Sequence, residues 1–164
     1  MWLYVLIGIG CVLGLFLIVA ALQPAEFRIV RTAQVRGPAD AVFNLINDLH
    51  AWESWSPWAK LDPGMKREYA GPPQGVGASH SWLGNKKVGE GRMTVTASEP
   101  FRLVRLKLEF IKPWTATNVA EFEIREECGQ SQISWSMTGK NDFGGKVFGL
   151  LMNMDKMVGR DFEK

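Results

Sequence analysis

The first 25 residues contain no charged side chain, and this run constrains the chain more than any other feature. Residues 2–22 are almost entirely apolar, and a helix needs about 20 apolar residues to cross the hydrocarbon core of a bilayer. Pro24 ends the helical pattern, and Trp2 and Tyr4 lie where interfacial aromatic side chains anchor a span. A cleaved signal peptide would carry basic residues before a shorter apolar stretch, and none precede this run. We therefore expect a transmembrane anchor over residues 1–25.

The residues that flank this run predict its orientation. Arg28, Arg31 and Arg36 follow it, whereas no basic residue precedes it. Basic residues accumulate on the cytoplasmic side of membrane helices, so we expect a cytoplasmic body. Gly10 and Gly14 form a Gly-x-x-x-Gly pair, which lets two membrane helices approach closely. The pair indicates either a weak homodimer or only the ordinary glycine content of a membrane helix.

The remaining residues, 26–164, are enough for one domain with its own core. The whole chain has 19 basic and 17 acidic residues, for a net charge of +2, and the two signs are interspersed. A nucleic-acid-binding domain would cluster its basic residues on one element, so we expect no nucleic-acid partner. Cys11 and Cys128 lack the companion ligands of a zinc site. We expect neither a metal nor a cofactor.

An alternation of apolar and polar residues predicts strands through most of this body. The expected strands are residues 27–35, 76–83, 88–97, 101–110, 114–124 and 132–138. Short strands separated by Gly, Pro and Asn are typical of an antiparallel meander. Between the first two strands we expect a helix and then a second short helix or turn over residues 48–58. The expected apolar face of the first helix is Val42, Leu45, Ile46 and Leu49.

The last segment, residues 143–164, has the apolar periodicity of a long helix. A sheet with one apolar face must be covered, and this helix is the expected cover. Helices on one side of an antiparallel sheet indicate an α+β fold. No Gly or Pro marks the end of the helix, so we expect it to continue beyond Lys164 in a longer chain.

Four motifs in the body stand out beside this order of elements. They are Val42-Phe43 with Asn47-Asp48, Trp52 with Trp55-Ser56-Pro57-Trp58, residues 88–93, and residues 154–159. The motifs and the element order resemble bacterial membrane-anchored members of the START-like, or SRPBCC, superfamily, which includes polyketide cyclases and lipid-transfer domains. The resemblance implies a helix-grip fold, in which a curved antiparallel sheet wraps around a long C-terminal helix. It also implies a location in the bacterial inner membrane.

This resemblance further implies a cavity between sheet and helix that holds a lipid-like, polycyclic or isoprenoid-like molecule. The expected ligand-binding residues are Trp55, Trp58, His80, Trp82, Met93, Leu106, Phe110, Trp114, Asn118, Phe122, Trp135, Leu151 and Met154. Asn118 is the polar member of an apolar strand face. Burying an amide without a partner costs roughly 1–3 kcal/mol, so Asn118 must meet either backbone or ligand. The tryptophans at 52, 55 and 58 either pack the core of the short helices or line the cavity mouth.

His80 and Tyr69 are the candidates for acid–base catalysis, since His80 shares its strand face with Trp82. A histidine at such a position is also a common hydrogen-bonded core residue. The sequence contains no readable pairing of a nucleophile with a base, and this superfamily hosts many activities. We favour a membrane-tethered protein that binds a hydrophobic ligand. The alternatives are a cyclase-type or hydratase-type enzyme and a regulatory interaction module without a ligand.

Overall fold

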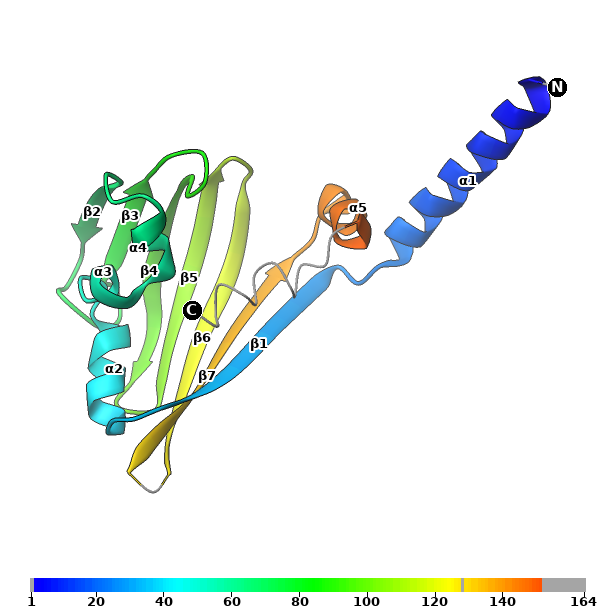
Figure 1. The fold of residues 1–164 in the computed structure, drawn as a ribbon. Coiled ribbons are helices and arrows are strands. Elements are labelled where there is room, and N and C mark those ends of the chain that lie inside the picture. Colours follow the sequence, from blue (N-terminus) through cyan, green and yellow to red (C-terminus); the bar gives the residue numbers. More distant parts are fainter. Residues whose placement is uncertain (1, 128, 152–164) are drawn as a thin grey trace.

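The computed structural model describes residues 2–127 and 129–151 (Figure 1). Helix α1 comes first and strand β1 follows it, before three short helices and six more strands. The bounds are α1 Trp2–Leu22, β1 Glu26–Val35, α2 Ala39–Asn47, α3 Trp52–Trp55, α4 Pro57–Leu61, β2 Lys66–Ala70, β3 Ser79–Leu83, β4 Glu90–Glu99, β5 Leu103–Lys112, β6 Ala116–Glu127, β7 Gln130–Lys140 and α5 Phe143–Leu151.

Within the described residues, the strands form one antiparallel sheet in the order β1-β7-β6-β5-β4-β3-β2. Strands β2 to β7 form a meander, and the last of them, β7, pairs with the first strand of the chain, β1, along the whole length of β1. The sheet is strongly twisted and curved, and helices α2, α3 and α4 lie on one side of it (Figure 1). This arrangement confirms the α+β class and the curved antiparallel meander, whereas the long C-terminal helix of the expected helix-grip fold is not shown: the described residues have only the short α5, which contacts α1. We refer to the face toward these helices as the inner face.

Helix α2 packs across β5, β6 and β7. Its buried side is spaced at intervals of three and four residues, as expected for one face of a helix, and consists of Ala39, Val42, Phe43 and Ile46. Pro38 precedes the helix, and Asp40 lies in its first turn, where a carboxylate interacts favourably with the helix dipole. The prediction that Leu45 belongs to the buried face is wrong, because Leu45 is 48% exposed.

The observed strands differ from the expected ones in two places. Strand β2 was not among the expected strands, because its sequence KREYA is mostly polar and it lies at the edge of the sheet. The strand expected over residues 76–83 begins only at Ser79, and Val76 lies in the exposed loop before it. The loop contains three glycines and two prolines, so residues 71–76 leave the ladder, and pairing with β4 resumes where the N–H of Gly77 donates to the carbonyl of Val95 at 2.9 Å.

Helix α1 is the one helix, among the described residues, that is long and apolar enough to cross a membrane. It projects away from the sheet (Figure 1), and nearly all of its side chains are exposed. A Cβ at Gly10 or Gly14 would have no neighbour within 4 Å among the described residues. Dimerisation through this glycine pair stays a prediction.

The C-terminal helix lies beside the end of α1. Lys146 Nζ on α5 donates to the carbonyl of Ala21 at 3.2 Å, and the N–H of Asn141 donates to the carbonyl of Ala25 at 2.8 Å. A cation near the last carbonyls of a helix is favourable. The structure shows a short helix in place of the long one expected over residues 143–164. The remainder of that segment, residues 152–164, lies outside the described residues.

Candidate functional site

One row of side chains crosses the inner face from edge to edge. The antiparallel register pairs its members strand by strand, so they share one face of the sheet. From β2 to β1 the row is Tyr69, His80, Met93, Leu108, Asn118, Gly139 and Phe27. This cross-strand row is apolar in the middle and carries a polar group on each side of its apolar centre. His80 and Asn118 are three strands apart, or about 14 Å at the usual strand spacing.

Two glycines make room for large side chains on the inner face. A Cβ at Gly139 would overlap Asn118 Oδ1 and the ring of Phe27. A Cβ at Gly91 would overlap the ring of Trp82, so the indole lies directly over β4. Glycine in the interior of a strand often marks such a close approach. Glycine at these two strand positions therefore lets the rings of Phe27 and Trp82 and the amide of Asn118 pack directly against the sheet.

An aromatic cluster fills the inner face over β6 and β7. Phe122 stacks on Trp135 with ring centroids 4.8 Å apart, and Trp52 meets Phe122 edge to face at 5.8 Å. Trp58 meets Trp135 edge to face at 5.7 Å. The indole N–H of Trp52 donates to the carbonyl of Ile46 at 2.9 Å, and that of Trp55 to the carbonyl of Leu45 at 3.1 Å.

These two indole bonds satisfy carbonyls near the end of α2, where a helix leaves carbonyls without an intrahelical partner. The tryptophans were expected either to pack the core or to line a cavity mouth, and the structure separates them. Trp52 is a buried core residue, whereas Trp55 and Trp58 are half-buried against the core and retain exposed surface.

His80 is buried in the inner face without a hydrogen-bond partner. Its side chain is only 6% exposed, and no group of the described chain lies within hydrogen-bonding distance of Nδ1 or Nε2. Burial, together with the nearby charge of Arg67, lowers the pKa of His80 to about 4. The ring is therefore neutral at pH 7, with one nitrogen able to donate and the other able to accept.

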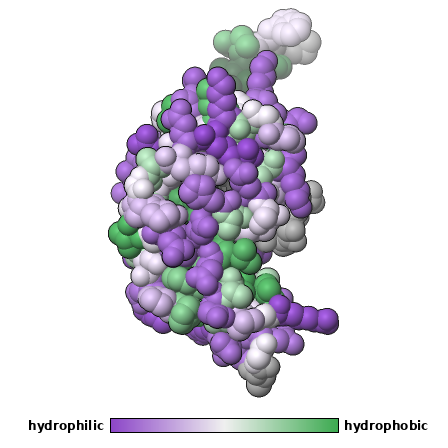
Figure 2. Space-filling model, turned by 90° about the vertical axis from the view of Figure 1, so that its left-hand side faces the viewer, coloured by the Kyte–Doolittle hydropathy of each residue, from purple (hydrophilic) through white to green (hydrophobic). Residues whose placement is uncertain are grey.

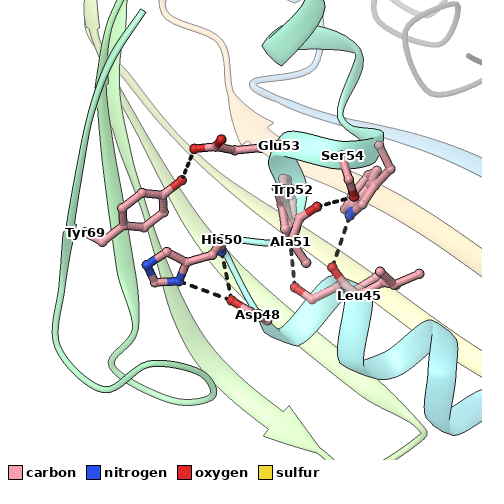
Figure 3. A network of polar contacts seen from close by, with 10 residues as sticks. Leu45, Asp48, His50, Ala51, Trp52, Glu53, Ser54 and Tyr69 are labelled. Carbon is pink, nitrogen blue, oxygen red and sulfur yellow. Dashed lines mark hydrogen bonds and ion pairs between the residues drawn. The ribbon is translucent and has the colours of Figure 1, made fainter.

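A stack of three rings leads from this histidine to the surface. Tyr69 stacks on His80 with ring centroids 4.8 Å apart, and His50 stacks on the other side of Tyr69 at 3.9 Å. Figure 3 shows the polar contacts that hold the outer two rings. Tyr69 donates its hydroxyl to Glu53 Oε1 at 2.9 Å, and His50 Nδ1 lies 3.2 Å from Asp48 Oδ1.

The environment of Tyr69 makes it a poor acid. Burial raises the pKa of Tyr69 to about 12, and its hydrogen bond to the Glu53 carboxylate contributes to that shift. Arg67 Nε lies 3.6 Å from the same carboxylate and partly offsets the effect. Tyr69 therefore keeps its proton at neutral pH and is held toward Glu53.

Asn118 is the second polar group of the cross-strand row. It is 8% exposed, and its Nδ2 lies 3.7 Å from Met137 Sδ, a weak acceptor. The amide therefore gains little from the sulfur contact. Of the polar side chains in the row, Tyr69 is bonded to Glu53 and Asn118 contacts a weak acceptor, whereas His80 has no partner among the described residues.

An open hollow of about 290 Å³ lies between the β2–β3 loop and the segment that follows α2. Its lining residues are Leu49, His50, Tyr69, Ala70, Gly71, Pro72, Pro73, Ala78 and Ser79. The outer two rings of the stack thus line this hollow, while His80 lies behind Tyr69. On this side of the molecule hydrophilic side chains cover most of the surface (Figure 2).

The structure brings most of the expected site residues to the inner face. His80, Trp82, Met93, Asn118, Phe122 and Leu106 are buried there, and Phe110, Trp135, Trp55 and Trp58 are half-buried. Trp114 does not join them, because β6 begins only at Ala116 and Trp114 is 69% exposed in the preceding turn. Leu151 ends α5, and its side chain, like all of Met154, lies outside the described part of the chain.

Sequence reasoning missed the members of the site that come from outside the expected strands. His50 and Glu53 are not among the expected site residues, yet both contact Tyr69. Phe27 and Gly139 were not assigned to the site, although they complete the cross-strand row. The alternation in residues 27–35 was a usable signal for Phe27, whereas the stack on Tyr69 depends on the register of β2.

Comparison with known proteins supports this architecture. Residues 26–164 match the family described as polyketide cyclase / dehydrase and lipid transport. No curated protein matches the chain. Among solved structures, protein MLL2253 from Mesorhizobium loti is similar with a TM-score of 0.59 and 14% identity, over 84% of this chain and 92% of that chain.

Two further structures share the fold. A protein from Nitrosospira multiformis gives a TM-score of 0.57 and 19% identity over 82% of this chain and 90% of that one. The Aha1 dimer from Colwellia psychrerythraea gives a TM-score of 0.55 and 12% identity, over 84% of this chain and 87% of that chain. At these identities the likeness shows the fold alone. The superfamily predicted from the sequence motifs is confirmed by the family match, and the chain belongs to the polyketide cyclase / dehydrase and lipid transport family.

Proposed function

We propose that this chain is a membrane-tethered protein that binds a hydrophobic molecule carrying one hydrogen-bonding group. The ligand lies on the inner face of the sheet, and its polar group meets His80. The observation that carries the proposal is a buried imidazole without a partner at one side of an otherwise apolar, aromatic surface. Ligand sites commonly combine apolar walls with a few polar groups that fix orientation.

The energetics of His80 support a binding role. Leaving a buried polar group without a partner costs about 1–3 kcal/mol. A core residue without a function could be replaced by an apolar side chain of similar shape at no such cost. A ligand hydroxyl, carbonyl or carboxylic acid would supply the missing partner, and a neutral imidazole can serve either as donor or as acceptor. Lipid, isoprenoid and polycyclic molecules with one such group fit this description.

Acid–base catalysis finds less support at the same residues. A general base works best when its pKa lies near the operating pH. Burial lowers the pKa of His80 to about 4, and burial raises that of Tyr69 to about 12, so neither is poised for proton transfer at neutral pH. Both values suit groups that hold one protonation state and form hydrogen bonds.

The tether is the second part of the proposal. Helix α1 inserts into the bacterial inner membrane as a single span, and the body lies on the cytoplasmic side because Arg28, Arg31 and Arg36 follow the span. An apolar ligand partitions into the bilayer, so a tether keeps the binding face where the ligand is concentrated. Burial of ligand surface at about 25 cal/mol per Å² drives affinity.

Native mass spectrometry of the full chain, purified from bacterial membranes, tests the proposal. We expect a co-purifying apolar molecule at near-stoichiometric occupancy, and its extraction identifies the polar group. The His80→Phe variant removes that group's partner while keeping an aromatic ring of similar size. It should retain less of the molecule, whereas Val119→Ala, a change on the face of the sheet opposite the inner face, should retain the normal amount. A chain that purifies empty, and that binds none of the lipids in a membrane extract, would contradict the proposal.

A further inference from the structure

We infer that the end of the sheet nearest α1 docks onto the bilayer, with Trp114 and Ile111 at the headgroup level and basic side chains on anionic phospholipid. This surface, which we call the membrane-facing rim, consists of the β5–β6 turn (residues 111–115) and the β3–β4 turn (residues 84–89). The inference rests on the proposed tether and goes beyond it, because a tether alone leaves the orientation of the body free.

The strand register places the rim beside the foot of α1. A connection of three residues, 23–25, joins the end of α1 to the start of β1 at Glu26, and Glu26 pairs with Lys140 at the end of β7. In an antiparallel meander the β5–β6 and β3–β4 turns lie at this same end of the sheet, as the pairing of Glu90 with Lys112 requires. Figure 1 shows the β5–β6 turn, α5 and the foot of α1 along one side of the body.

The rim exposes large apolar side chains that water does not favour. Trp114 is 69% exposed and Ile111 is 48% exposed. Tryptophan is enriched at membrane–water interfaces because its ring is amphipathic. Helix α1 has such anchors, Trp2 and Tyr4, only at its far end, and residues 18–25 contain no aromatic residue. Trp114 supplies the aromatic anchor that the near end of the span lacks.

The charges of the rim suit an anionic membrane. Lys86 and Lys87 are both exposed in the β3–β4 turn, which contains no acidic residue. Basic residues close to a membrane surface are attracted to anionic lipid. At the opposite end of the sheet, the exposed Glu126 and Glu127 come just before the β6–β7 turn. The two lysines of the β3–β4 turn, and not the net charge of this end of the sheet, are the groups expected to meet anionic lipid, since Asp62 lies against the same turn and accepts from the N–H of Asn85 at 2.7 Å.

Helix α5 extends the rim next to the span. Phe143 is exposed on α5, and Lys146 on the same helix donates to the carbonyl of Ala21 near the end of α1. An apolar ring and a lysine thus lie where the span leaves the hydrocarbon. Docking through this side holds the sheet end against the lipid, so that an apolar ligand reaches the body without crossing bulk water.

A photoreactive residue tests the docking in the full chain, reconstituted in nanodiscs of phosphatidylcholine and phosphatidylglycerol in equal parts. Three variants each carry p-benzoylphenylalanine at one position: Trp114 in the rim, Leu13 in the middle of α1, and Phe101 at the opposite end of the sheet. Phe101 is the matched control, because it is also an exposed aromatic residue in a turn between two strands. Lipid adducts are counted by mass spectrometry after illumination.

We expect lipid adducts at positions 13 and 114 and at least tenfold fewer at position 101. Adding Lys86→Glu and Lys87→Glu should lower the yield at position 114 several-fold in these nanodiscs while leaving the yield at position 13 unchanged. Adducts at 13 with none at 114, or equal yields at 114 and 101, would overturn the docking and leave the tether standing. A lack of adducts at position 13 would overturn the tether and the docking together.

Discussion

Two regions of the inner face both contain buried aromatic rings, one over β6 and β7 and the other over β2 and β3. They differ in the hydrogen bonds that their ring nitrogens make. In the first region the indole N–H groups of Trp52 and Trp55 both donate to α2 carbonyls, and Phe122 is fixed between two tryptophans. In the second region His80 is equally buried, but neither ring nitrogen has a partner among the described residues. The first region is built for stability, and the second retains a polar group whose partner is expected to be the ligand.

The largest effect is expected in the stable region. Phe122→Ala removes the ring between Trp52 and Trp135 and leaves a cavity, which costs about 3–5 kcal/mol in the free energy of unfolding. Denaturant titration of the full chain in detergent micelles measures this loss. Val76→Ala, in an exposed loop, should change the value by about 0.5 kcal/mol or less. Similar values for the two variants would show that the aromatic cluster is not the core.

The next effect concerns the space beneath Trp82. Gly91→Ala places a Cβ where the indole and the carbonyl of Glu109 lie, and such overpacking costs about 1–3 kcal/mol. Gly64→Ala is the matched control, since a Cβ at Gly64 makes only an ordinary contact at 3.7 Å with Asp62. Thermal unfolding of both variants tests this. If Gly91→Ala melts with the wild type, Trp82 does not lie against β4.

The pH dependence of stability comes third and concerns the ligand-facing region. His80 titrates near pH 6.5 when unfolded and at about pH 4 when folded, so between these values the unfolded chain binds the extra proton. The free energy of unfolding should therefore fall as the pH is lowered from 6.5 to 4, by at most about 1.4 kcal/mol per pH unit. His80→Phe should flatten this part of the profile. It should also be at least as stable as the wild type at pH 7, because it removes a buried group without a partner.

Two results would contradict this account of His80. One is a profile for His80→Phe as steep as that of the wild type, which would mean that other groups cause the dependence. The other is a large loss of stability in His80→Phe at pH 7, which would mean that the imidazole is a satisfied core residue. Val119→Ala serves as the control, since this side chain is exposed on the opposite face of the sheet.

The smallest effect concerns the indole bond of Trp55. Trp55→Phe keeps an aromatic ring but removes the donation to the carbonyl of Leu45, and a hydrogen bond of this kind contributes about 0.5–1.5 kcal/mol. Because the ring is half-buried, water can partly replace the donor, so we expect the lower part of that range. Denaturant titration alongside Phe122→Ala measures it. A loss as large as that of Phe122→Ala would place Trp55 in the core rather than at its margin.

Much of the fold could be predicted because alternation is a local signal. In β5, residues 104, 106 and 108 are buried while 105 and 107 are exposed, as the sequence indicates. The same signal misplaced Trp114, since the alternation of this segment runs back to residue 114 although the strand begins only at Ala116. Strand β2 was missed because an edge strand has few apolar residues to mark it.

The site was harder to predict because it depends on register between distant segments. The ring stack joins a residue after α2 to residues of β2 and β3, and no spacing in the sequence relates these three positions. His80 and Asn118 were correctly singled out as polar residues on apolar strand faces. The sequence could not show that His80 has no partner, since that depends on every neighbour packed around it.

The most direct test of the central claim is nitrogen NMR of the two histidine rings in the full chain, labelled with ¹⁵N-histidine and held in detergent micelles. The spectra are compared as purified, after extraction of the ligand with excess detergent, and after the extracted molecule is returned. The account predicts that the ring nitrogens of His80 shift on extraction and return to their first positions, while those of His50 stay in place. Unchanged His80 signals through the whole cycle would contradict the claim that its partner is a bound ligand.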